Sequence, residues 1–285
     1  MTVSSWHGLM VGPELHALAR LHAIRGCSVG GAVMPKRQPE TRKTIDPVTY
    51  VREIEAKWLS SDDVYDLIDC LKDGGHADTR RLRLYACALA RFFWDGFGHP
   101  VHRRVVELAE AFADGLIPFG ELDSAFTLAR ELPERFQTEE DGADICPGRV
   151  AFATAFEDAA FGAWEAYYNG AAVCGFLADV PGADRFDGVG PLRDVFGNPF
   201  RLVTFDPRWR TSDVVGLARA IYDDGAFERM PILADALMDA GCEDEHIIGH
   251  CRGDRTHVRG CWVVDLVLGK ITKRIGTTDT GREIG

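Results

Sequence analysis

Hydrophobic residues recur every three or four positions through most of the chain, and capping or stop residues separate these segments. Ile54 and Trp58 follow the capping pair Asp46-Pro47, and the next periodic segment stops at Gly74-Gly75. This period is that of an amphipathic helix with one buried face. The N-terminal half is therefore expected to hold five helices, beginning near Asp46, Ser61, Asp78, Pro100 and Glu121.

An aromatic and alanine-rich segment, 149–178, follows a polar stretch at 134–148. Its aromatic residues lie at helical spacing, which is typical of buried core positions and much less often of a cofactor site. Glycines are expected to break the segment into two helices, and a second loop follows at 180–190. The glycines concerned are Gly162, Gly170 and Gly175.

Prolines shape the chain after this second loop. Pro199 and Pro207 bias the residues before them away from helix, so 201–205 is expected to be an extended connector. Thr211 then caps a helix, and Pro231 opens another that stops at Gly241. The predicted fold class is mainly α, a multi-helix array with one short extended connector that contains proline.

These signals divide the chain into five predicted parts. Basic residues outnumber acidic ones in the first part, which has little apolar surface to bury, and Met34 within it is a second candidate for the initiating residue. The parts are a flexible basic leader (1–45), an N-terminal helical region (46–132), a linker with aromatic-rich helices (133–190), a C-terminal helical module (191–270) and a flexible tail (271–285).

Composition and charge narrow the classes of function. The net charge of −12 is spread along the chain and repels phosphate backbones, so nucleic-acid binding is not expected. No apolar run approaches the ~18 residues of a membrane span, and the N-terminus has no signal-peptide pattern. We therefore expect a cytoplasmic protein without a membrane partner, in which the eight cysteines are reduced.

Histidines and cysteines gather near the C-terminus, which gives the strongest chemical signal in the chain. His246 and His250 are four residues apart, and so are His257 and Cys261. Two such pairs on adjacent helices could supply the four ligands of a structural zinc ion, and Cys251 is a fifth candidate. The spacing lacks the pattern of a zinc finger or a zinc protease. Core packing and helix capping therefore remain open as the alternative.

Three arginines surround the same segment, close to a helix start that we expect at 256–258. Arg252, Arg255 and Arg259 could hold a phosphate or carboxylate group there, together with the free N–H groups of the helix. The alternative is a solvated loop in which the arginines pair with acids such as Asp254 and Asp265.

Several longer motifs stand out in the two halves of the chain. In the C-terminal half they are LRDVFGNPF, FDPRW, AIYDDGAFERMPILADAL, DAGC, HCRG and HVRGCWVVDLVLGK, and in the N-terminal half KWLSS, RRLRLYACALARFFW and RRVVELAEAFADG. Together they resemble a module found repeatedly in planctomycete proteins. The resemblance covers about 46–270 and implies a lineage, without an activity or a set of site residues. One departure is Arg255-Thr256, where that family often has Gly-Pro.

Two functions of different classes are compatible with these patterns. The absence of known catalytic motifs favours a non-catalytic interaction or scaffold module that binds a protein partner and needs no cofactor. The alternative is a metal- or anion-binding protein, including a zinc-dependent hydrolase, that uses the His/Cys/Arg cluster at 246–261.

Overall fold

The computed structural model describes residues 46–97, 99–130, 147–176, 183–201 and 203–271. By its internal contacts the chain divides into 1–45 and 46–285, and only the second of these units contains described residues. The predicted leader, most of the 134–148 linker and all but the first residue of the predicted tail lie outside the described residues.

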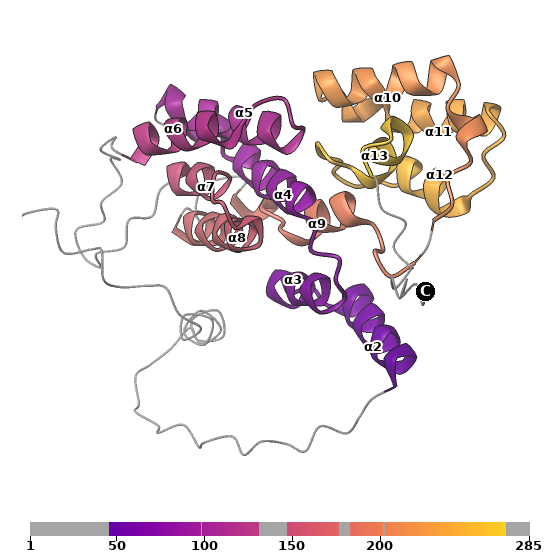
Figure 1. Ribbon diagram of the computed structural model, residues 1–285, viewed down its shortest axis with the longest axis horizontal. Coiled ribbons are helices and arrows are strands. Elements are labelled where there is room, and N and C mark those ends of the chain that lie inside the picture. The colour runs from indigo at the N-terminus through magenta and orange to yellow at the C-terminus, as the bar shows by residue number, and fades with distance from the viewer. Residues whose placement is uncertain (1–45, 98, 131–146, 177–182, 202, 272–285) are drawn as a thin grey trace, which may run out of the picture. The chain divides into compact units, whose positions relative to one another are not determined.

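Helices make up the fold of the described residues, which include no strand, and this confirms the mainly α prediction. Short 3-10 turns occur at Trp94–Gly96, Ala183–Arg185, Pro207–Trp209 and Phe227–Arg229. The α-helices are α2 (Pro47–Ser60), α3 (Val64–Asp73), α4 (Thr79–Phe92), α5 (Pro100–Ala113), α6 (Phe119–Arg130), α7 (Pro147–Ala153), α8 (Ala159–Phe176), α9 (Val189–Phe196), α10 (Ser212–Asp224), α11 (Met230–Asp239), α12 (Glu245–Arg252) and α13 (Trp262–Leu268) (Figure 1).

Short polar side chains begin many of these helices, as the sequence predicts. The carboxylate of Asp46 accepts hydrogen bonds from the backbone N–H groups of Val48 and Thr49. The hydroxyl of Thr211 accepts one from Val214 in the same way. Each bond satisfies a donor that the first helical turn leaves without a partner. None of the described helices is long and apolar enough to cross a membrane.

The aromatic segment is broken at a different place from the one predicted. The break between α7 and α8 lies at 154–158, where Asp158 accepts the N–H groups of Ala160 and Phe161 and so starts α8. A side chain on Gly162 would come within 2.5 Å of the carbonyl oxygen of Ala153. This glycine therefore permits close contact with the end of α7 and does not stop the helix.

Two further boundaries differ from prediction. Helix α9 occupies Val189–Phe196, where no helix was predicted, and Asp187 caps its first N–H groups. The last helix begins at Trp262, later than the predicted 256–258. The reason is the backbone at Gly260, whose positive φ of 92° does not fit a right-handed helix that runs from 256–258 into α13.

The apolar side chains form two buried clusters. The first contains residues of α2 to α9, including Trp58, Tyr85 and Phe196. The second gathers residues of α10 to α13, including Tyr222 and Trp262. Figure 1 shows α10 to α13 grouped together in orange and yellow, and pairwise contacts join α10 with α11 and α13, and α11 with α12. Leu192, Val195 and Phe196, which open the predicted C-terminal module, belong to the first cluster.

A buried ionic network joins helices of the two clusters. Asp114, which follows α5, accepts hydrogen bonds from Arg80 of α4 at 3.0 Å and from the Tyr222 hydroxyl of α10 at 2.8 Å. Arg259 and Lys270 also contact this carboxylate, at 2.9 and 3.0 Å. Burial raises the pKa of Asp114, but these hydrogen bonds outweigh burial and bring the pKa down to about 2. Asp114 is therefore ionised at pH 7.

Replacing Asp114 tests the weight of this network. Asp114→Asn leaves Arg259 and Lys270 without their carboxylate and Arg80 with Asp265 alone, so we expect the free energy of unfolding to fall by about 3 kcal/mol. Because the folded-state pKa lies below the ordinary value of 3.8, this stabilisation is present above pH ~4 and is lost as the pH falls towards 2. Urea unfolding between pH 2 and 7 measures both effects.

The matched control for this prediction is Asp123→Asn on the exposed face of α6, which should change the stability by less than ~0.5 kcal/mol. An equal effect of the two substitutions would contradict a special role for Asp114.

Candidate metal centre

Four side chains with metal-ligating atoms meet at the junction of α9, α12 and α13. Asp194 comes from α9, His250 from α12, His257 from the loop between α12 and α13, and Cys261 from the residue that precedes α13. One ligand atom from each residue lies within 4.8 Å of those from the other three. Asp194 and Cys261 are 1% and 0% exposed, so the group is closed to solvent.

The local sequence brings these residues together in two steps. Asp244 caps α12, which places His250 in its last turn, and the helix ends at Gly253. Gly260 then adopts a positive φ of 92°, and a side chain there would lie 2.8 Å from Leu84 of α4. A glycine is required at this position because the backbone is left-handed and pressed against α4. The turn aims Cys261 back towards His250.

The carboxylate of Asp194 is the centre of the group. Its Oδ1 lies 2.6 Å from Nδ1 of His257 and 3.1 Å from Nε2 of His250. Its Oδ2 accepts the backbone N–H of Val258 at 2.9 Å. Three hydrogen bonds therefore fix a carboxylate that has been removed from water, as a buried ionised group requires.

The neighbouring indole determines which nitrogen of His250 carries the proton. Trp262 donates its Nε1–H to Nδ1 of His250 at 3.0 Å, so Nδ1 is an unprotonated acceptor. The proton of the neutral ring is then on Nε2, which faces both Asp194 and, at 3.2 Å, Sγ of Cys261. His257 donates from Nδ1 to Asp194, and its buried Nε2 has no hydrogen-bond partner among the described residues.

The central carboxylate of the group is ionised at pH 7. Burial raises the pKa of Asp194, but hydrogen bonds from His250 and His257 outweigh burial and leave the pKa below 3.8. Burial lowers the pKa of His250 more than the bond with Asp194 raises it, so this ring stays neutral at pH 7. Among the described residues, no lysine or arginine lies within 4.0 Å of the Asp194 oxygens. A buried carboxylate without a lysine or arginine beside it favours the entry of a cation.

The structure brings together three of the five predicted metal ligands, namely His250, His257 and Cys261. His246 lies in the first turn of α12, is exposed, and pairs with Nη1 of Arg201 at 2.7 Å. Cys251 is buried outside the group, and burial raises the pKa of its thiol to about 12.

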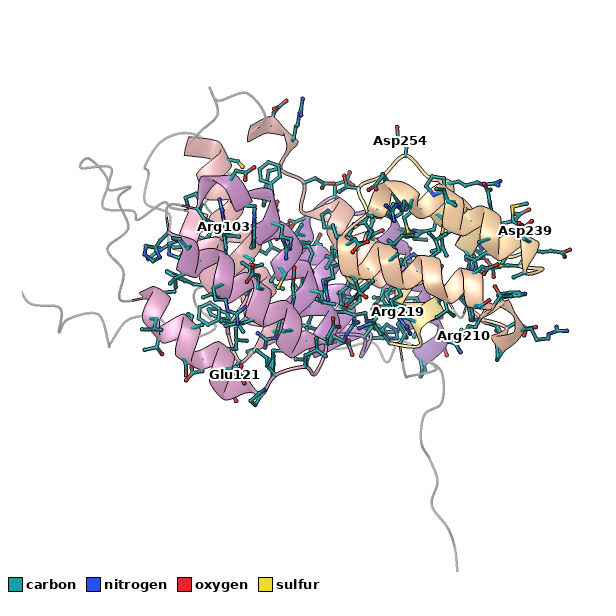
Figure 2. The ribbon with its side chains drawn as sticks, turned by 90° about the horizontal axis from the view of Figure 1, so that it is seen from above. Arg103, Glu121, Arg210, Arg219, Asp239 and Asp254 are labelled. Carbon is teal, nitrogen blue, oxygen red and sulfur yellow. The ribbon has the colours of Figure 1, made fainter. Side chains whose placement is uncertain are left out.

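The three predicted anion-binding arginines do not converge. Arg252 pairs with the exposed Asp235 of α11, and Arg259 joins the Asp114 network with its guanidinium 4.3 Å from the Tyr222 ring centroid. Arg255 lies in an open groove that is described below. Asp254, a predicted partner, stands exposed at the tip of the loop between α12 and α13 (Figure 2).

Sequence reasoning missed Asp194. A signal for it exists in the pattern, because Asp194 stands between the apolar residues Leu192 and Val195 on a short helix and is fully buried with them. A charged residue within an apolar run is rarely buried without a partner. The partner, however, lies more than fifty positions away, and a local reading of the chain does not reach it.

Replacing Asp194 tests the importance of the central carboxylate. In Asp194→Asn the amide nitrogen presents donors to groups that are themselves donors, so we expect a loss of about 3 kcal/mol in the free energy of unfolding. Chemical denaturation measures the loss. Asp235→Asn, which removes an exposed ion pair with Arg252, should cost less than ~1 kcal/mol. If the two variants were equally stable, Asp194 would not be the centre of the junction.

Comparison with known proteins gives no information about this site. No protein family model, no curated protein and no solved structure matches the chain. The group of Asp194, His250, His257 and Cys261 is therefore interpreted from its own distances, burial and charges.

Proposed function

We propose that this protein is a non-catalytic helical module whose α9, α12 and α13 junction is closed by a bound divalent metal, zinc by the chemistry of the donors. The observation that carries the proposal is the buried Asp194 carboxylate, which lies within reach of two imidazoles and a thiol but has no lysine or arginine beside it among the described residues. A metal ion would supply positive charge at this carboxylate.

The donor set suits zinc better than the other common metals. One carboxylate oxygen, two imidazole nitrogens and one thiolate sulfur are all ligands that zinc accepts in a tetrahedral site. Zn²⁺ with ionised Asp194 and Cys261 also has a net charge of zero, which lowers the cost of burial. Burial holds the pKa of the Cys261 thiol well above its ordinary value, so its proton leaves only when the metal binds.

A site with four protein donors favours a structural role over a hydrolytic one. Catalytic zinc sites usually have three protein ligands and an open position for water or substrate. Here the fourth position is taken by a protein donor and the surroundings exclude solvent. The proposal therefore combines the predicted scaffold function with the predicted metal site, and it disfavours a zinc-dependent hydrolase.

A separate observation supports the binding of a protein partner. Helix α2 exposes four large hydrophobic side chains, with Val48 59%, Tyr50 41%, Val51 45% and Leu59 60% exposed. Apolar side chains grouped on one helix are typical of interaction surfaces more than of free surfaces. This face is a second candidate site, and it supports a scaffold role without reference to the metal.

Metal analysis of the untagged protein tests the proposal. We expect about one zinc ion per chain by mass spectrometry, and a lower melting temperature after removal of zinc by a chelator. Cys261→Ala and His257→Ala should each lose most of the zinc, because the tetrahedral site then lacks a donor.

The matched control is Cys251→Ala, which removes a buried thiol of the same segment that lies outside the group. It should keep the zinc. Protein that contains no zinc, and binds none when zinc is added, would leave the group as a hydrogen-bonded latch and would overturn the proposal.

Trp262 provides an independent test of how the metal binds. A metal on Nε2 of His250 requires the proton to move to Nδ1, which then faces the indole N–H at 3.0 Å instead of accepting from it. Trp262→Phe removes this competing donor, so we expect zinc affinity to rise by up to roughly tenfold in competition with a chelating dye. Trp209→Phe, outside the group, should leave the affinity unchanged. A weaker zinc affinity in Trp262→Phe than in Trp209→Phe would contradict this geometry.

A further inference from the structure

A groove of about 1230 Å³ lies on the side of the junction that faces α2 and the connector after α9. His250 and Trp262 contribute to one wall, and the remaining lining comes mainly from α2, α4, α12 and residues 193–210. Its size exceeds that of a typical small-molecule site, so it has room for a ligand together with water.

The charge of this groove is opposite to that of the chain. Five arginines line it against two glutamates, Glu55 and Glu245, although the whole chain has a net charge of −12. A concave surface with one sign of charge focuses its field on ligands of the other sign. The arginines are Arg81, Arg193, Arg201, Arg210 and Arg255.

Arg81 is the most informative of these residues because it is 92% buried, with 8% of its surface exposed. Its guanidinium lies 4.5 Å from the ring centroid of Phe196. It forms an ion pair with Asp78, whose Oδ1 lies 3.6 Å from Nε of Arg81. This pair is long, so the guanidinium can donate to a further carboxylate or phosphate group in the groove.

Three other arginines are held mainly by groups that carry no full negative charge. Arg210 donates to the backbone carbonyls of Leu266 and Val267, and Arg201 pairs with the imidazole of His246. Arg193 donates to backbone carbonyls, and its nearest carboxylate lies 3.9 Å away on the highly exposed Asp62. These bonds hold the side chains in position without neutralising them, which is what a preorganised anion site needs.

Aromatic side chains complete the lining. Trp58, Phe196, Phe205 and Trp262 all border the groove, and the guanidinium of Arg210 lies 5.1 Å from the Phe205 ring centroid. Apolar walls with a few fixed polar groups are typical of sites for organic ligands. We propose that this groove binds a small organic anion, whose phosphate or carboxylate group pairs with the arginines while its apolar body lies against the aromatic wall.

The observations favour a small anion over a nucleic acid or a membrane surface. Five arginines gather in the groove, whereas the chain as a whole has a net charge of −12 and so repels extended polyanions. The inference does not depend on zinc, because the arginines and the aromatic wall lie outside the group of Asp194, His250, His257 and Cys261 except for the shared residue His250.

Calorimetric titration of the full chain at low salt tests the inference by measuring ligand binding. Phenyl phosphate and benzoate are the anionic probes, and benzamide is the uncharged control. We expect one or both anions to bind and benzamide not to bind. Arg255→Gln and Arg201→Gln, both on exposed side chains, should each weaken binding about tenfold, the effect of losing one charge-assisted hydrogen bond. Arg208→Gln, at a side chain that is 89% exposed and outside the groove, should have no effect.

Each outcome of this titration either supports or overturns the proposed anion site. Binding of phenyl phosphate alone, or of benzoate alone, supports the inference and identifies the anionic group. Failure of both anions to bind at ~10 mM, or an equal loss in Arg208→Gln, overturns it. Tighter binding of a single-stranded oligonucleotide or of anionic lipid vesicles than of either probe also overturns it in favour of a macromolecular ligand.

Discussion

The removal of one carboxylate from water shapes the C-terminal half of this protein. Asp194 is buried with the apolar face of α9, and three donors from residues 250–258 must reach it, because an unpaired buried charge would cost more than the fold can supply. The bonds from His250, His257 and Val258 hold the end of α12 and the following loop against α9.

Polar contacts also determine how the two apolar clusters are positioned against each other. Each cluster is closed by its own helices, and apolar packing alone is non-directional. Asp194 joins α9 of the first cluster to residues around α12 and α13 of the second, and Asp114 gathers Arg80, Arg259 and Lys270 from both. Buried polar networks are costly when incomplete, so these two junctions define one arrangement of the clusters.

The candidate metal centre and the arginine-lined groove share one residue, His250. On one side of His250 lies a buried group whose donors fit a divalent cation. On the other side lies an open groove in which five arginines outnumber two glutamates. Because His250 belongs to both and is bonded to Trp262, a metal at the first site would alter the indole that lines the second. The two proposals can nevertheless fail separately, since the arginines that define the groove contact neither Cys261 nor Asp194 among the described residues.

The sequence by itself determined the helical class, the helix starts at Asp46, Pro100 and Thr211, and the gathering of His250, His257 and Cys261, because hydrophobic period, caps and short spacings are local properties. Only the tertiary structure decided the remainder. It added Asp194 as the fourth donor, excluded His246 and Cys251, separated Arg252 from Arg259, and placed the buried Arg81 at a groove. These outcomes depend on contacts between residues tens to nearly two hundred positions apart, which follow from how helices pack and not from the pattern within any one of them.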